Sequence, residues 1–202
     1  MDLVNRGLSG YNTRMLLTVL LDILKHENLE RVKVVTLMMG SNDASFPDTN
    51  PDLEEFGDNL LKIILNHGIN KESIILIAPP PILPDKWTKF RNSCPGPEYK
   101  NCKDNELSKK YAIEVGKVAS RLSISFLDLF SAMMKSCNLD AALYDGLHLA
   151  RDGAAVLCSL LVPELDKRLG AVFPEWREME NESDARCVEA YNKWKLENPD
   201  RL

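Results

Sequence analysis

Apolar residues along the chain alternate between short continuous runs and longer stretches with helical spacing. The runs at 32–39 and 74–78 are almost wholly apolar and end at Gly or Pro, which is typical of strands buried on both faces of a sheet. Shorter runs predict two more strands, at 3–5 and 124–129. Apolar residues spaced three and four apart predict helices over 17–24, 53–64, 107–122 and 156–161. This alternation predicts an α/β fold, in which crossover helices cover a parallel sheet.

Two segments fall outside this pattern. Residues 82–102 form a long predicted loop, rich in Pro, Cys and aromatic residues. Because long loops in compact domains tend to be functional or mobile, we interpret it as a lid or a substrate wall. The highly charged segment after Phe173 predicts an appended helix or a partly disordered extension. We therefore expect one domain over 1–173 and an extension over 174–202.

Composition narrows the classes of function and location. The net charge is -5 and no basic cluster is present, which argues against a nucleic-acid partner. No apolar run approaches the roughly 20 residues that span a bilayer, and the N-terminus lacks the features of a signal peptide, so we expect a cytoplasmic protein without a membrane span. The five cysteines have irregular spacing, which favours free thiols over a disulfide between Cys94 and Cys102.

Three short segments carry candidate chemistry, and each lies at a strand end or before the last helix. After the run at 3–5, the segment NRGLSGYNT places the amide of Gly10 where no Cβ hinders an anion. After the run at 32–39, the segment GSND presents the carboxamide of Asn42 as a neutral hydrogen-bond donor. The segment DGLH places Asp145 three residues before His148, a spacing that lets a carboxylate hold one ring nitrogen of an imidazole.

Each segment also has a structural interpretation. NRGLSGYNT can be a glycine turn with Asn12 or Thr13 as a helix N-cap, and GSND can be an Asx turn that caps the next helix. Asp-Gly is a common turn, and a single histidine is often structural. Together, however, a backbone donor, an amide donor and an Asp/His pair supply most of an acyl-transfer site.

The three segments resemble the second, third and fifth sequence blocks of the SGNH hydrolase (GDSL esterase/lipase) superfamily. They are most similar to the isoamyl acetate-hydrolysing esterase group in NRG-SGYNTR and DGLHL. The resemblance implies a three-layer, flavodoxin-like fold with a parallel sheet and a small-molecule ester as substrate. It implies that His148 is the general base, that Asp145 orients it, and that Gly10 and Asn42 are oxyanion donors. It implies no metal and no organic cofactor.

The first block of that superfamily, a Gly-Asp-Ser turn with the nucleophilic serine, does not occur in the 202 residues. We therefore expect a chain that lacks the first strand and helix of the fold, that derives from a truncated form, and that has almost no activity as it stands. The alternative is a binding or regulatory pseudoenzyme of the same fold. A phosphate-binding module is less favoured because no Gly-rich loop with Lys or hydroxyl ligands is present.

Overall fold

Three short parallel strands form the sheet, which agrees with the predicted class of fold. They are β1 (Val35–Met38), β2 (Ile74–Ile77) and β3 (Ser125–Leu127), in the order β1-β2-β3. Val35 pairs with Ile74, and Ile75 pairs with Ser125. All four residues of the central strand β2 are buried, as its continuous apolar sequence predicts. Pro79 follows close behind and cannot donate to a strand ladder.

The first long apolar run contains a strand, as predicted, but the prediction that this strand is buried on both faces is wrong. In β1, Thr36 is exposed and Met38 is 43% exposed, because β1 lies at the edge of the described sheet and pairs only with β2. The predicted strand at 3–5 is also wrong. These residues are irregular and Leu3 is 99% exposed, since no strand of the described residues pairs with them.

Three helices pack on one another beside this sheet, and each begins at a polar N-cap. They are α1 (Thr13–Leu24), α2 (Leu53–Leu65) and α4 (Asn105–Leu122), which confirm three of the predicted helices. The caps are Asn12, Asp52 and Asp104, whose side chains each accept a hydrogen bond from the backbone of the first turn. Helix α1 packs on α2, and α2 packs on α4.

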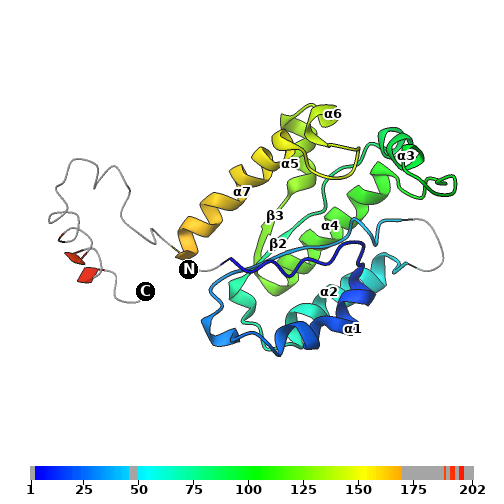
Figure 1. Ribbon diagram of the computed structural model, residues 1–202. Coiled ribbons are helices and arrows are strands. Elements are labelled where there is room, and N and C mark those ends of the chain that lie inside the picture. The colour runs from blue at the N-terminus through cyan, green and yellow to red at the C-terminus, as the bar shows by residue number, and fades with distance from the viewer. Residues whose placement is uncertain (1–2, 46–49, 170–188, 190–191, 194–195, 198–202) are drawn as a thin grey trace. The chain divides into compact units, whose positions relative to one another are not determined.

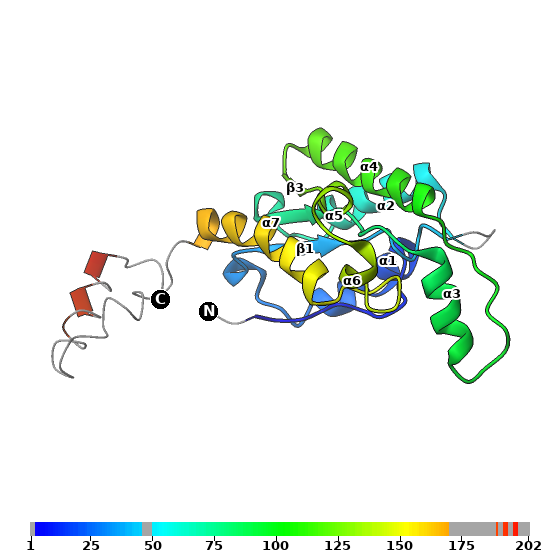
Figure 2. The ribbon, with the colours of Figure 1, turned by 90° about the horizontal axis from the view of Figure 1, so that it is seen from above.

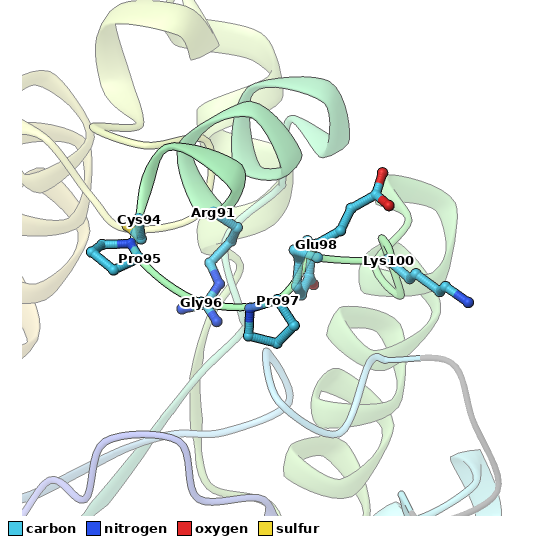
Figure 3. A pocket seen from close by; sticks show the side chains of 8 residues that line it. Arg91, Cys94, Pro95, Gly96, Pro97, Glu98 and Lys100 are labelled. Atoms are coloured by element: carbon cyan, nitrogen blue, oxygen red, sulfur yellow. The ribbon is translucent and has the colours of Figure 1, made fainter.

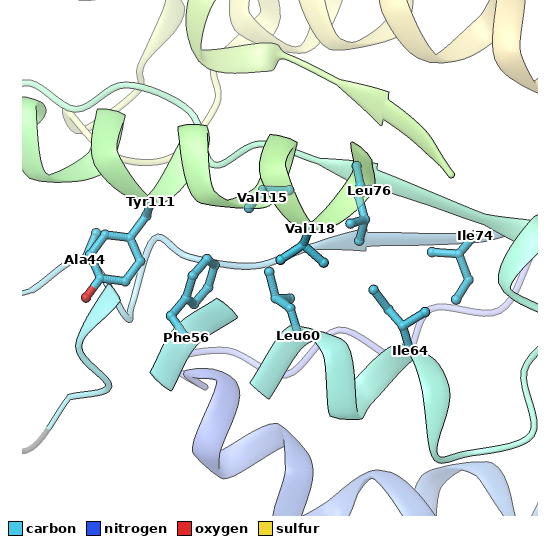
Figure 4. Packing of buried hydrophobic residues seen from close by; sticks show 10 residues of the cluster. Ala44, Phe56, Leu60, Ile64, Ile74, Leu76, Tyr111, Val115 and Val118 are labelled. Atoms are coloured by element: carbon cyan, nitrogen blue, oxygen red, sulfur yellow. The ribbon is translucent and has the colours of Figure 1, made fainter. Parts of the chain in front are cut away.

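The main hydrophobic core lies between β2 and the helices α2 and α4 (Figure 4). Phe56 of α2 meets Tyr111 of α4 edge to face, with ring centroids 4.9 Å apart. The Tyr111 hydroxyl donates to the carbonyl of Pro51 at 2.7 Å, so the only polar atom of that side chain is satisfied in the core. Burial of each large apolar side chain stabilises the fold by about 1.5–3 kcal/mol.

Helices on the other side of the sheet include two that the sequence pattern missed. In Figure 1, α2 lies below the strands, while α5 (Leu129–Ser136) lies above them, close to α6 (Leu139–Ala142). Both are too short for apolar residues to repeat over several helical turns. The last predicted helix is α7 (Arg151–Leu169). The view from above shows α4 and α6 on opposite sides of the strands (Figure 2). The short 3₁₀ helices η1 (Leu29–Arg31) and η2 (Lys71–Ser73) precede β1 and β2.

The predicted loop over 82–102 is only partly a loop, because it contains α3 (Pro84–Ser93). Proline at the first helical position fits this start, since its missing N–H has no partner in a helix anyway. The helix is mostly polar and offers little periodic apolar signal. Cys94 and Cys102 are free thiols, as are Cys137 and Cys158, in agreement with the prediction, while Cys187 lies outside the described residues.

The computed structural model describes residues 3–45, 50–169, 189, 192–193 and 196–197. The chain divides into two units, Arg6–Leu161 and a second unit of Met1–Asn5 with Val162–Leu202. All the candidate site residues belong to the first unit. The predicted boundary between 173 and 174 and most of the extension after it lie outside the described ranges, and both stay predictions. Within those ranges, no helix combines the length and the apolar character that a membrane crossing requires.

Candidate active site

Asp145 and His148 form a closed hydrogen-bonded pair. One carboxylate oxygen, Oδ1, accepts the backbone N–H of Leu147 at 2.9 Å and that of His148 at 2.8 Å. The other, Oδ2, lies 2.6 Å from Nδ1 of the His148 ring. The side chain of Asp145 is 2% exposed and that of His148 is 67% exposed. The pair therefore has a buried, fixed carboxylate and an imidazole that faces solvent.

This geometry determines which ring nitrogen carries the proton. Burial alone would raise the pKa of Asp145, but the hydrogen bonds from the His148 N–H, the His148 ring and the Leu147 N–H lower the pKa below its ordinary value. Asp145 is therefore ionised at neutral pH and can only accept. Nδ1 of neutral His148 must then be the donor, which leaves the lone pair of Nε2 free to take a proton.

A tight hairpin carries the pair between α6 and α7. Leu143 and Leu149 form an antiparallel bridge, and the Tyr144 N–H donates to the His148 carbonyl at 2.8 Å. Gly146 occupies the turn with φ +96°, a conformation that side chains rarely adopt. The DGLH segment thus is a turn, as its structural interpretation requires, and this turn is what orients the imidazole.

Helix α3 is fastened to this hairpin, so the predicted substrate wall has a defined anchor. The Leu83 N–H donates to the carbonyl of Gly146 at 2.9 Å, and Nζ of Lys86 donates to the carbonyl of Leu143 at 2.9 Å. The ring of Trp87 meets the ring of His148 edge to face, with centroids 5.8 Å apart. Figures 1 and 2 both show α3 next to the hairpin.

Gly10 and Asn42 belong to two neighbouring loops. The side-chain Nδ2 of Asn42 donates to the carbonyl of Tyr11 at 3.0 Å, which joins the loop after β1 to the residue after Gly10. Because a carboxamide has two N–H groups, one hydrogen remains beyond this bond. Gly10 has φ +79°, and no atom lies within 4 Å of where its Cβ would be. Its conformation, not crowding, therefore requires glycine.

The structural interpretations of these two loops have different outcomes. Asn12 is the N-cap of α1, and its Oδ1 accepts the N–H of Met15 at 3.0 Å, so the first segment is both a glycine turn and a cap. The second segment does not cap the next helix, because Asp52 is the N-cap of α2.

Asp43 holds these two loops together, although no role was predicted for it from the sequence. Its Oδ1 accepts the backbone N–H of Thr13 at 2.9 Å and the hydroxyl of Thr13 at 2.6 Å. The Thr13 hydroxyl in turn accepts Nδ2 of Asn59 at 3.2 Å. Burial raises the pKa of Asp43, against the opposing effect of the Thr13 hydrogen bonds, and the second oxygen, Oδ2, is buried without a hydrogen-bond partner. Its place directly after Asn42 was the one available signal.

Lys103 is a second buried charge that sequence reasoning missed. It is 6% exposed, and its Nζ donates to the carbonyl of Ser41 and, at 2.8 Å, to Oγ of Ser45. Burial lowers the pKa of Lys103, and the nearby charge of Asp43 partly opposes that change. Lys103 thus also fixes the loop that carries Asn42. No local sequence pattern distinguishes it from the other lysines.

The structure therefore joins the predicted residues into two groups. Asp145 contacts His148, and Asn42 contacts the residue after Gly10. The convergence of both groups on one substrate atom stays a prediction. A separate cavity of about 360 Å³ is lined by Arg91 and by residues 94–100, and Figure 3 shows the Arg91 side chain directed into it from α3. In the described part of the chain, no three His, Cys, Asp or Glu side chains gather as a metal site.

Comparison with known proteins adds an independent observation. The model of the GDSL-like lipase/acylhydrolase family matches residues 1–156. The chain belongs to this family. As a GDSL-like protein it is 36% identical over 195 residues to the isoamyl acetate-hydrolyzing esterase 1 homolog of Rattus norvegicus, which covers 89% of this chain and 76% of the relative. It is 33% identical over 185 residues to a GDSL esterase/lipase of Arabidopsis thaliana, with 84% and 75% covered.

A solved structure gives the same answer for the fold of this GDSL-like chain. The lipase/acylhydrolase from Enterococcus faecalis superposes with a TM-score of 0.62 at 28% identity, and the match covers 79% of this chain and 72% of that one. The resemblance found in NRGLSGYNT, GSND and DGLH, and the predicted α/β fold with a parallel sheet, are thereby confirmed.

Proposed function

We propose that this chain carries the general base and the oxyanion donors of a carboxylic ester hydrolase. In this proposal His148 is the base, Asp145 orients it, and Gly10 and Asn42 stabilise the oxyanion. Membership of the GDSL-like lipase/acylhydrolase family supports the class of reaction. The observation that carries the proposal is the 2.6 Å contact between Oδ2 of Asp145 and Nδ1 of a solvent-facing His148.

The reaction follows from the protonation state of that pair. Nε2 of His148 takes the proton of a serine hydroxyl while the serine oxygen bonds to the ester carbonyl carbon. Collapse of the tetrahedral intermediate breaks the bond to the alcohol, and the protonated imidazole gives its proton to the departing oxygen. A water molecule then repeats the sequence on the acyl-enzyme, releases the carboxylic acid and restores the serine.

The negative oxygen of the tetrahedral intermediate needs donors that are already in place. The Gly10 amide and the Nδ2 hydrogen of Asn42 fit this role because α1, Asp43 and Lys103 hold their loops. Loss of one such donor typically lowers turnover about 10²- to 10³-fold.

In our proposal the serine comes from a Gly-Asp-Ser segment that pairs with the sheet, since neither Gly-Asp-Ser nor Gly-x-Ser-x-Gly occurs in the 202 residues. The open edge of β1, with Met38 43% exposed, supports a further strand there. Removal of the nucleophile from a serine hydrolase lowers turnover about 10⁶-fold. The 202 residues alone should therefore have almost no activity.

Small acetate esters are the proposed substrates. The support is the name of the rat relative, an isoamyl acetate-hydrolyzing esterase homolog at 36% identity. The test compares the 202-residue chain with a longer protein in which a Gly-Asp-Ser segment precedes these residues, using isoamyl acetate and a fluorophosphonate probe. We expect only the longer protein to release acetate and to react with the probe, and His148→Ala should abolish its turnover. The proposal would be refuted if the longer protein does not hydrolyse the ester, or if hydrolysis survives His148→Ala.

The second candidate is a binding or regulatory pseudoenzyme. It is favoured by the core that the chain forms from its own residues around Phe56 and Tyr111, although no serine motif is present (Figure 4). A single cooperative unfolding transition of the 202 residues, together with no hydrolysis by any longer product, would support this candidate over the esterase.

A further inference from the structure

Three aromatic rings lie in series beside the imidazole of the candidate site. Trp87 lies 5.8 Å from His148 and 6.0 Å from Phe90, and Phe90 lies 6.1 Å from Tyr144, each measured between ring centroids. The backbone N–H of Tyr144 donates to the carbonyl of His148 at 2.8 Å. All three ring distances lie in the range of favourable aromatic contacts. We call Trp87, Phe90 and Tyr144 the aromatic wall.

The wall is held by two elements that are fastened to each other. Trp87 and Phe90 stand on α3, whereas Tyr144 and His148 are opposite residues of the hairpin, so their side chains leave it on the same face. The indole N–H of Trp87 also donates to the Tyr99 hydroxyl at 3.0 Å, which fixes the angle of its ring.

The wall is partly exposed to solvent. Trp87 is 8% exposed and is the buried member of the wall, while Tyr144 is 71% exposed and presents most of its side chain to solvent. Asp145 holds Nδ1 of His148, so Nε2 lies on the side of the imidazole away from the carboxylate. The oxygen of a departing alcohol must come within about 3 Å of Nε2 to receive its proton. Because the Trp87 ring lies against the imidazole, a group attached to that oxygen can reach the wall.

From this geometry we infer that the aromatic wall binds the alcohol half of the ester and selects alcohols that carry an aromatic ring. The inference rests on the proposed function, because it takes His148 as the group that protonates the alcohol. A flat ring can contact Tyr144 and Phe90 face to edge, and a saturated ring of similar size gains only apolar burial. Lys86 already donates to backbone carbonyls, and the Arg91 guanidinium lies over the Trp87 ring, 5.7 Å from its centroid. Because both nearby cations are engaged in this way, an uncharged aryl group fits the wall best.

The test measures binding to the 202-residue chain, independently of turnover. Phenyl acetate and cyclohexyl acetate are titrated while the amide signals of residues 144–148 are followed by NMR. We expect phenyl acetate to bind about 2- to 10-fold more tightly than cyclohexyl acetate, the range that one aromatic pair supplies. Tyr144→Leu should remove this preference. Tyr144→Phe, which keeps the ring, is the matched control and should retain it.

Trp87→Leu is the second variant, and circular dichroism checks that it folds. This substitution should also weaken the binding of phenyl acetate. Equal affinities for the two esters, a preference that survives Tyr144→Leu, or binding that leaves the signals of residues 144–148 unmoved would each overturn the inference. Failure of the esterase proposal alone gives a different result: phenyl acetate would bind at the wall, yet no longer protein with a Gly-Asp-Ser segment would hydrolyse it. Hydrolysis by such a protein without a preference for aryl esters would refute the inference about the wall and leave the esterase proposal intact.

Discussion

Gly146 is the position where a single methyl group should separate α3 from the candidate site. A Cβ there would lie 2.6 Å from the backbone nitrogen of Trp87 and 2.7 Å from the carbonyl oxygen of Leu83. Both are backbone atoms of the α3 start, so neither can rotate away as a flexible side chain would. The substitution Gly146→Ala must therefore move either the helix or the hairpin.

The cost can be worked from two contributions. A non-glycine residue at the observed φ of +96° costs about 1–2 kcal/mol. Separation of α3 from the hairpin breaks the hydrogen bond from Leu83 to Gly146, worth about 0.5–1.5 kcal/mol, and forces a backbone shift. We expect Gly146→Ala to lower the free energy of unfolding by roughly 2–4 kcal/mol, a large part of the 5–15 kcal/mol typical of a domain.

Gly10→Ala is the matched control. Its φ of +79° imposes similar backbone strain, but nothing lies within 4 Å of its added methyl group, so the loss should be only about 1–2 kcal/mol. Urea unfolding followed by circular dichroism measures both variants. NMR should also show that the amide of His148 shifts in Gly146→Ala and not in Gly10→Ala. If Gly146→Ala loses no more stability than Gly10→Ala, the close packing of α3 on the hairpin is refuted.

Three further predictions concern buried polar groups. The lowered pKa of Asp145 means that its contribution to stability is present at neutral pH and is lost as the pH falls below about 4 through that pKa. The stability gap between parent and Asp145→Asn in urea unfolding should therefore be constant near neutral pH and narrow below about pH 4; a gap that does not narrow there would contradict this. The raised pKa of Asp43 has the opposite sign: its contribution is lost as the pH rises from about 4 through that pKa. Asp43→Asn, which keeps an oxygen for Thr13, should gain on the parent over this rise, and a flat difference would count against a buried charge. Tyr111→Phe should cost about 1–3 kcal/mol near pH 7, because the Pro51 carbonyl loses its donor. Since burial raises the pKa of Tyr111 to about 12, stability measured from about pH 10 upward should fall more steeply in the parent than in this variant.

The sequence by itself determined the class of fold and the residue types of the site. A fully apolar run such as 74–78 can only be stable where both faces are covered, so the central strand was readable from its composition. Spacing of three residues likewise brings Asp145 to His148 through local backbone geometry alone, and the pair forms within one hairpin.

Tertiary structure decided what depends on distant neighbours. The first long apolar run resembles a buried strand, yet the exposure of Met38 depends on which elements lie beside β1, and its own residues do not carry that information. Helix α3 is mostly polar and is held by Gly146 and Leu143, some 60 positions downstream. Lys103 and Asp43 acquire their roles only because burial changes the cost of their charges, and burial is a property of the assembled fold.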